Sequence, residues 1–240
     1  MTPVVLEPAR NLPHNRLITA IDTGDAARAH ELVEAVGPHC GLIKLGLEAF
    51  SALGPAVFAA SGGYPVFLDV KLHDIPNTVA GAVRALLPCR PAMLTIHAAG
   101  GAAMIAAARE AAENAGDARP LLLAVTVLTS LSAGELSQTG VAGGPRQQVL
   151  RLGRLALNAG ADGLVCSAAE ISVLRDAFGA APVLVVPGIR PAGAGHGDQA
   201  RVATPQEAVA AGASYIVVGR PITQAADPAA AAAAIAASIV

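Results

Sequence analysis

Charged residues crowd the end of one apolar stretch of the sequence. The apolar residues 66–68 lead into Asp69, Lys71 and Asp74, three charges within six positions. Such a run predicts a buried strand, in which residues two apart share a face, so the side chains of Asp69 and Lys71 point the same way. Pro76 suits the first turn of a helix, which puts Asp74 near a helix start. Charges here cost desolvation free energy unless they are paired or functional, so they form either a structural ion pair or a site that uses charge for chemistry.

A second lysine lies inside another apolar stretch. Lys44 falls within the apolar residues 42–45, and a lone buried lysine is costly, so a nearby carboxylate is expected. Asp69, on the strand that follows, is the obvious candidate.

Polar residues, glycines and one proline lie at or just after the ends of the other apolar stretches as well. They are Asp22, His97, Thr129, Ser130, Ser167, Pro187, Gly188, Arg190, Gln199, Gly219 and Arg220. Several have a structural alternative: Asp22 can cap the helix that begins near Asp25, and His97 is more typical of a histidine satisfied by hydrogen bonds. Gly219 would let backbone N–H groups approach an anion and Arg220 would add charge-assisted hydrogen bonds, although an arginine in an exposed loop is the alternative.

Eight apolar stretches can form strands. They are residues 17–21, 41–47, 66–71, 93–98, 121–128, 163–167, 183–187 and 215–219. Helical segments alternate with these stretches. The clearest are residues 26–36, 79–87, 104–114, 147–158 and 205–211. A last helix, residues 228–238, follows Asp227 as its N-cap and has Pro228 at its first position.

This alternation predicts a parallel sheet covered by helices. Eight strand–helix units in 240 residues match an α/β (β/α)8 TIM barrel, a single domain over residues 1–240, with a doubly wound open sheet as the alternative. In a barrel the reacting groups lie at the C-terminal ends of the strands and in the loops that follow. The polar residues named above fall at those positions.

Composition limits the classes of function. The chain is 53% hydrophobic and 14% charged, so it can bury a large core, and its net charge of −2 argues against a general nucleic-acid binder. The three cysteines are far apart in apolar contexts, which disfavours a disulfide framework or zinc site and fits a reducing cytoplasm. The sequence contains no signal-peptide pattern and no apolar stretch long enough to span a membrane. It also lacks a nucleotide-binding glycine motif and ordered metal-ligand spacing, so a metal is not required.

The stretch from Asp69 to Thr78, with the sequence DVKLHDIPNT, closely resembles the signature of the orotidine 5′-monophosphate decarboxylase family. Supporting stretches are residues 17–22, 125–130, 163–167, 187–190, 197–199 and 217–222, so the resemblance covers nearly the whole chain. The pattern is similar to the shorter, bacterial-type branch. The glycine-rich residues 191–197 depart from the family, which often has a second acidic residue before Asp198, and this departure affects only details of the loop.

The resemblance implies a homodimer of barrels with each active site at the subunit interface. Lys44, Asp69 and Lys71 would come from one subunit, and Asp74 and Thr78 from the other. Charges of opposite sign would then alternate, which would resolve the desolvation cost noted above.

The family also implies a substrate-binding set, with the ribose on Asp22 and the pyrimidine edge on Thr129. The set would be Asp22, Lys44, Thr78, Thr129, Pro187, Arg190, Gln199, Gly219 and Arg220. Its members Arg190, Gln199, Gly219 and Arg220 would hold the 5′-phosphate. The loop after the seventh strand would close over the site as a lid.

The implied reaction is decarboxylation of orotidine 5′-monophosphate to uridine 5′-monophosphate without a cofactor. Loss of carbon dioxide leaves electron density on C6 of the pyrimidine, so the site must stabilise a carbanion by charge and then protonate it. Lys71 would do both, and Asp69 and Asp74 would keep its ammonium charged and aimed.

Two other functions are open. One is a magnesium-dependent sugar-phosphate decarboxylase or isomerase of the same barrel superfamily, in which an acidic metal ligand tends to replace Lys44. The other is a non-enzymatic phosphate-binding barrel, indicated only by Gly219 and Arg220.

Overall fold

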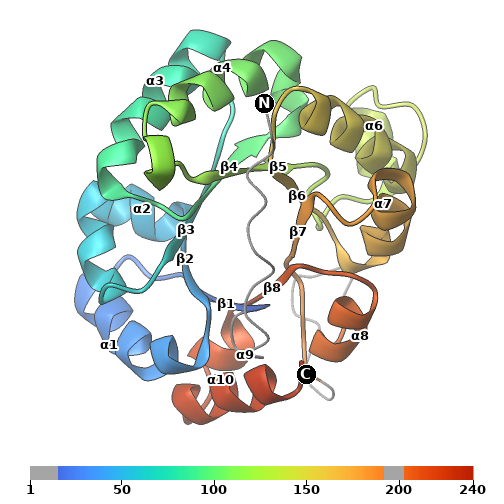
Figure 1. Ribbon diagram of the computed structural model, residues 1–240. Helices are drawn as coiled ribbons and strands as arrows, with labels where there is room; N and C mark the ends of the chain where they lie inside the picture. Colours follow the sequence, from blue (N-terminus) through green and yellow to red (C-terminus); the bar gives the residue numbers. More distant parts are fainter. Residues whose placement is uncertain (1–15, 192–202, 240) are drawn as a thin grey trace.

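The computed structural model describes residues 16–191 and 203–239. Within these residues, eight parallel strands close into a barrel in sequence order, and β8 pairs with β1. Helices surround the barrel on its outer side (Figure 1). The predicted TIM barrel is therefore confirmed, and pairing of the first strand with the last is incompatible with a doubly wound open sheet. The extent of the domain over residues 1–240 stays a prediction.

All eight predicted strands are present, and most end slightly earlier than the apolar stretches do. They are β1 (Leu17–Ile21), β2 (Leu42–Gly46), β3 (Val66–Leu72), β4 (Met93–His97), β5 (Leu121–Val125), β6 (Gly163–Val165), β7 (Val183–Val186) and β8 (Tyr215–Val218). The residues that follow these strand ends belong to loops, and several of them line the C-terminal mouth of the barrel.

The helices include the six predicted segments together with shorter ones. They are α1 (Ala26–Val36), α2 (Leu47–Leu53), α3 (Pro76–Leu86), α4 (Gly101–Glu113), α5 (Ala133–Gln138), α6 (Pro145–Asn158), α7 (Ile171–Phe178), α8 (Pro205–Ala210), α9 (Arg220–Thr223) and α10 (Pro228–Ala237). Two aspartates, Asp25 and Asp227, are N-caps of helices. The Asp25 carboxylate accepts the first N–H groups of α1, and Asp227 accepts the N–H of Ala230 in α10, as predicted.

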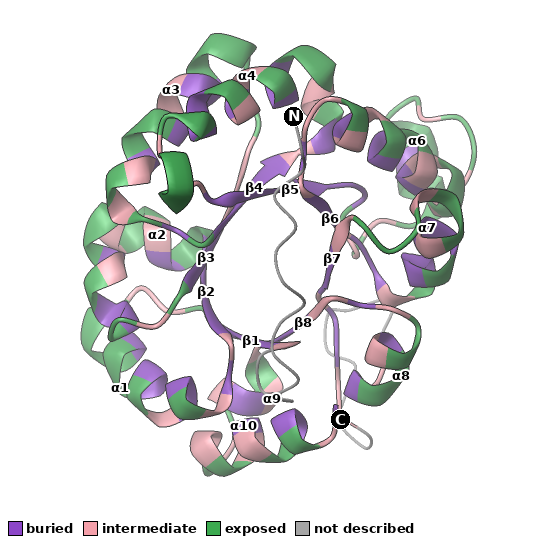
Figure 2. Ribbon diagram, viewed as in Figure 1, coloured by how far each residue is buried: buried purple, intermediate pink, exposed green. Residues whose placement is uncertain are grey.

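The apolar core has two layers. The outer layer lies between the barrel and the helices and includes Leu45 and Leu68. The inner layer fills the barrel itself, with Ile18, Leu42 and Phe67 among its members. Figure 2 shows this pattern as buried strands and inner helix faces with exposed outer helix faces. Because the chain has few aromatic residues, aliphatic side chains fill most of the interior.

Polarity changes along the barrel axis. On the inward face of β2, Leu42 at the N-terminal end is followed by Lys44 and then Gly46, and Gly46 lies beside Asp69 of β3. On β1 the inward residues Ile18 and Ala20 lead to Asp22 in the same way. The barrel therefore has an apolar floor and a charged C-terminal mouth.

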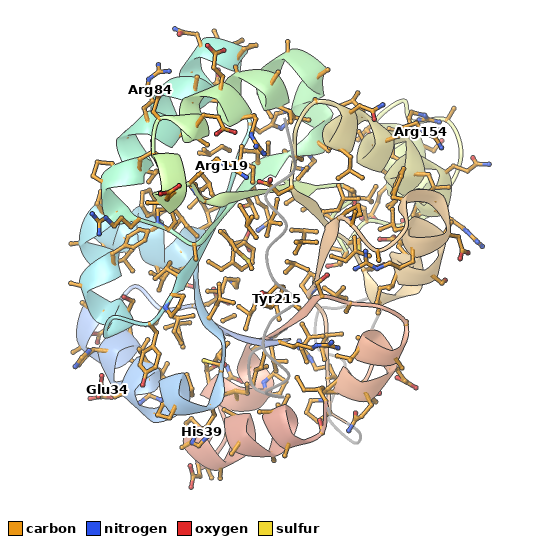
Figure 3. The ribbon with its side chains drawn as sticks, viewed as in Figure 1. Glu34, His39, Arg84, Arg119, Arg154 and Tyr215 are labelled. Atoms are coloured by element: carbon orange, nitrogen blue, oxygen red, sulfur yellow. The ribbon has the colours of Figure 1, made fainter. Side chains whose placement is uncertain are left out.

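A separate ionic cluster holds the N-terminal end of the barrel. The Asp162 carboxylate, just before β6, accepts hydrogen bonds from the guanidiniums of Arg109 and Arg119 and from the N–H of Leu122. Hydrogen bonding to Asp162 raises the pKa of Arg119, which Figure 3 labels. In TIM barrels this end serves stability rather than chemistry, so we interpret the cluster as structural.

Candidate active site

A cavity of about 530 Å³ opens at the C-terminal end of the barrel. Most of the predicted site residues line it. They are Asp22, Lys44, Asp69, Lys71, Thr129, Pro187, Arg190, Gly219 and Arg220. Its floor is the inner apolar layer, whose side chains, including the labelled Tyr215, fill the barrel in Figure 3. Gln199 lies outside the described residues.

Four side chains form a row of alternating charge along one wall of the cavity. Lys44 Nζ lies 2.9 Å from Asp22 Oδ1 and 3.9 Å from Asp69 Oδ2. Lys71 Nζ lies 2.9 Å from both carboxylate oxygens of Asp69. The expected pairing of Lys44 with Asp69 is confirmed, and Asp22 is a still closer partner. Asp22 is therefore not the cap of α1, a role that falls to Asp25.

An irregularity in β3 brings Asp69 and Lys71 together. Leu68 pairs with Leu94 of β4 and Leu72 pairs with Ile96, so residues 69–71 stand opposite Thr95 alone. This is a β-bulge, a device common beside active sites because it re-aims side chains. Lys71 has φ +50°, a left-handed conformation that costs about 1–3 kcal/mol for a residue other than glycine. The two side chains share a face, as strand alternation predicted, but the bulge provides the contact.

Sequence reasoning missed Thr95. This residue is fully buried on β4, and its hydroxyl accepts the Lys71 N–H at 2.9 Å and donates to Asp69 Oδ1 at 3.0 Å. A signal was available, because alternation between Met93 in the inner layer and His97 places Thr95 on the inward face of the strand. Other lining residues without a recognisable signal are Glu48, Val127, Cys166, Thr223 and Gln224.

Two arginines line the cavity after strands β7 and β8. Arg190 follows β7 and Arg220 begins α9, and both line the cavity. Burial, and next the positive charge of Arg220, lower the pKa of the Arg190 guanidinium. Arg190 is partly buried and Arg220 is exposed. Two neighbouring cations favour an anionic ligand, because such a ligand relieves their mutual repulsion.

Asp74 and Thr78 do not reach the cavity of their own chain. Both are exposed, and the Asp74 carboxylate accepts the N–H of Ile75 at 2.6 Å. Within the described chain, the ion pairs of the charge row involve Asp22, Lys44, Asp69 and Lys71 without Asp74. The predicted contribution of Asp74 and Thr78 to a neighbouring site is therefore a proposal, taken up below.

Two histidines pack beside the charge row. The rings of His73 and His97 stack with centroids 5.0 Å apart and planes inclined by 15°. His97 Nδ1 accepts the N–H of Ala99, so His97 is hydrogen-bonded as the sequence analysis favoured. Burial lowers the pKa of His97, and the charges of His73 and Lys71 lower it further.

Three further features bear on the kind of protein. Among residues 16–191 and 203–239, no group of three or more histidine, cysteine, aspartate or glutamate side chains could hold a metal ion. Over the same residues, none of the helices combines the length and apolar character needed to cross a membrane. The three cysteines, all in the described part, are free thiols.

Fold and site together define a TIM-barrel enzyme whose cavity combines a row of alternating charges with two arginines. The chain belongs to the family described as orotidine 5′-phosphate decarboxylase / HUMPS, whose sequence model matches residues 15–235.

Close relatives share the length as well as the sequence. The orotidine 5′-phosphate decarboxylase of Gluconobacter oxydans is 58% identical over 224 residues, which cover 92% of this chain and 95% of the relative. That of Anaeromyxobacter sp. strain K is 56% identical over 229 residues, covering 95% and 99%. A crystal structure of orotidine 5′-phosphate decarboxylase from Lactobacillus acidophilus matches with a TM-score of 0.83 at 38% identity, covering 93% of this chain and 98% of that one.

Proposed function

We propose that this protein converts orotidine 5′-phosphate to uridine 5′-phosphate and carbon dioxide, as the names of its full-length relatives indicate. The observation that carries the proposal is the Lys71 ammonium, held 2.9 Å from both oxygens of Asp69 at the mouth of the barrel. This ammonium is a fixed positive charge with a proton to give. The proposed reaction needs both properties at one carbon atom.

The bond between C6 and the carboxylate breaks, carbon dioxide leaves, and the electron pair stays on C6. The Lys71 ammonium stabilises this carbanion and then transfers a proton to C6, which completes the product. A unit-charge attraction at ~4 Å with an effective dielectric of ~20 amounts to about 4 kcal/mol, or roughly three powers of ten in rate. One contact is therefore insufficient. The Lys71 side chain is 34% exposed, so solvent can return the proton after each turnover.

The rest of the charge row keeps Lys71 in its working state. Asp69 aims the ammonium by accepting its hydrogen bonds with both carboxylate oxygens, and Lys44 balances the charge of Asp69 in turn, so that no charge in the row is isolated. Asp22 is half exposed at the end of the row. Its free carboxylate oxygen is placed to accept a hydrogen bond from a ribose hydroxyl.

The arginine side of the cavity suits the 5′-phosphate. Arg190 and Arg220 supply two guanidiniums, and Thr129 lies on the cavity wall where the pyrimidine edge would reach. Gln199 is proposed to join them. Binding of a phosphate remote from C6 contributes energy that can order the reacting end of the substrate.

A homodimer would complete the site. Three large apolar side chains, Leu47, Ile75 and Leu128, are exposed after strands β2, β3 and β5 at the C-terminal end of the barrel. Ile75 directly follows the exposed Asp74, and exposed apolar side chains at the end of the barrel that carries Asp74 and Thr78 fit a second copy of this chain. Asp74 of that copy would then give the Lys71 ammonium a second carboxylate. We also propose that the protein acts in the cytoplasm, as an enzyme of pyrimidine nucleotide synthesis.

Decarboxylation is tested by following the loss of orotate absorbance with pure protein. Turnover that persists with excess chelator is expected. The competing magnesium-dependent barrel function predicts chelator-sensitive activity on a keto-sugar phosphate instead. The Lys44 ammonium, 3.9 Å from Asp69, argues against that alternative because it already supplies the cation beside this carboxylate. Absence of turnover by a pure dimer contradicts the proposal.

The shared site is tested by mixing two inactive variants, Lys71→Ala and Asp74→Asn. In a mixed dimer, one of the two sites regains both Lys71 and Asp74, so partial activity should return after subunit exchange. The control is each variant incubated alone under the same conditions. If the mixture stays as inactive as its components while exchange is verified by mass spectrometry, Asp74 does not act across an interface.

A further inference from the structure

Hydrogen bonds connect both the backbone N–H and the ammonium of Lys71 to the Thr95 side chain, the ammonium through Asp69. In the bulge of β3, the Lys71 N–H does not face a β4 carbonyl in regular register and donates instead to Thr95 Oγ1. The same hydroxyl donates to Asp69 Oδ1, which is also an acceptor for Lys71 Nζ. The path from the Lys71 backbone through Thr95 and Asp69 therefore returns to the Lys71 ammonium.

We propose that Thr95 is a positioning residue that holds the Lys71 ammonium and the Asp69 carboxylate in one fixed arrangement for proton transfer. This inference rests on the decarboxylase function proposed above. Lys71 adopts a left-handed backbone conformation that a lysine does not favour, so surrounding contacts must hold it there. Thr95 supplies the contact made by the Lys71 N–H.

The chemistry of the hydroxyl fits this role. A threonine hydroxyl has one proton to donate and lone pairs to accept, and Thr95 uses the proton on Asp69 and a lone pair on the Lys71 N–H. Thr95 is fully buried, so water does not compete for either bond. Valine has nearly the same shape but can make neither bond, whereas serine can make both.

Thr95 is not among the residues that line the cavity. Its loss should therefore change the geometry of the reacting groups rather than the affinity for substrate. Small displacements of reacting groups reduce rates steeply. We expect Thr95→Val to lower kcat by about 10- to 100-fold and to leave KM within about twofold of the wild-type value.

Thr126 offers a matched control. It is also a buried threonine near a strand end, but its hydroxyl donates to the carbonyl of Val165 and contacts none of the charge row. Thr126→Val should leave kcat within about twofold of wild type while losing one hydrogen bond. Thr95→Ser should retain most of the wild-type kcat, because the hydroxyl is kept. If Thr95→Val does not fold, Thr95→Ser and Thr95→Ala make the same comparison, since they differ by the hydroxyl alone.

The outcomes separate this inference from the proposed function. If the wild type turns over orotidine 5′-phosphate and Thr95→Val matches the Thr126→Val control, or if Thr95→Ser loses as much kcat as Thr95→Val, Thr95 does not position the pair. If the wild type is inactive, the proposed function fails, and a crystal structure of Thr95→Val decides the positioning role. Departure of Lys71 from φ near +50° then supports it, and an unchanged Lys71 with its ammonium still on Asp69 overturns it.

Discussion

Replacing Gly46 by alanine should disturb the charge row without removing any charge. Gly46 lies on the inward face of β2, two residues after Lys44. A Cβ atom built on it would lie 2.5 Å from Asp22 Oδ1 and 2.8 Å from Lys44 Nζ. Both distances are shorter than carbon atoms tolerate, so at least one of the two side chains must move.

Burial decides which side chain moves. The Lys44 side chain is 11% exposed and the Asp22 side chain is 51% exposed, so Asp22 can swing into solvent and Lys44 cannot. Lys44 then keeps Asp69 as its remaining partner, at 3.9 Å. A hydrogen bond to a charged group contributes about 1.5–3 kcal/mol. Because Asp22 is half in solvent, we expect a loss of about 1–2 kcal/mol, or about a 5- to 30-fold drop in kcat/KM.

The assay is kcat/KM for orotidine 5′-phosphate, with Gly134→Ala as the control. Gly134 lies in α5, and the nearest atom to a Cβ there is Ser132 Oγ at 3.9 Å, an ordinary contact. The control should behave as wild type. If Gly46→Ala keeps wild-type kcat/KM, or if its crystal structure retains the 2.9 Å pair of Lys44 with Asp22, the reasoning from crowding is wrong.

Two further predictions concern stability. Asp162→Ala leaves the buried guanidinium of Arg119 without its main partner. The free energy of unfolding in urea should therefore fall by about 3–5 kcal/mol while kcat stays unchanged. A smaller loss of stability, or a loss of kcat, would contradict a purely structural role of the cluster. His97 has its pKa lowered in the fold, chiefly by burial, so it binds fewer protons folded than unfolded. Its contribution to stability is therefore complete above its unfolded pKa near 6.5 and is lost as the pH falls below it. His97→Gln should flatten the decline in unfolding free energy between pH 7.5 and 5.5, and an equal decline in both proteins would refute this assignment.

The sequence predicted the barrel because its strands are continuous apolar runs whose alternation with helices leaves few other folds. It also predicted a carboxylate for Lys44, since an unpaired lysine in such a strand would be too costly. Sequence therefore predicts the part of the site that depends on strand position alone.

The contact geometry was less accessible. A prediction from strand alternation assumes that β3 is regular. It therefore does not predict the bulge, in which residues 69–71 lie opposite Thr95. Asp22 had two equally plausible roles, and only the position of Lys44 Nζ decided between them. The roles of Asp74 and Thr78 depend on a second chain, which no pattern within one sequence can position.

The row from Asp22 to Lys71 has a consequence for how this enzyme can evolve. Each inner charge, Lys44 or Asp69, is shared by two neighbours, so a mutation that neutralises one of them leaves the other, which is largely buried, with one partner fewer. Effects of single changes here should be strongly non-additive, and a lysine lost together with an adjacent aspartate should be milder for folding than the loss of either alone. We therefore expect relatives that have lost this activity to have replaced a lysine and an adjacent aspartate together. Few single substitutions in the row should give a stable protein with a different activity.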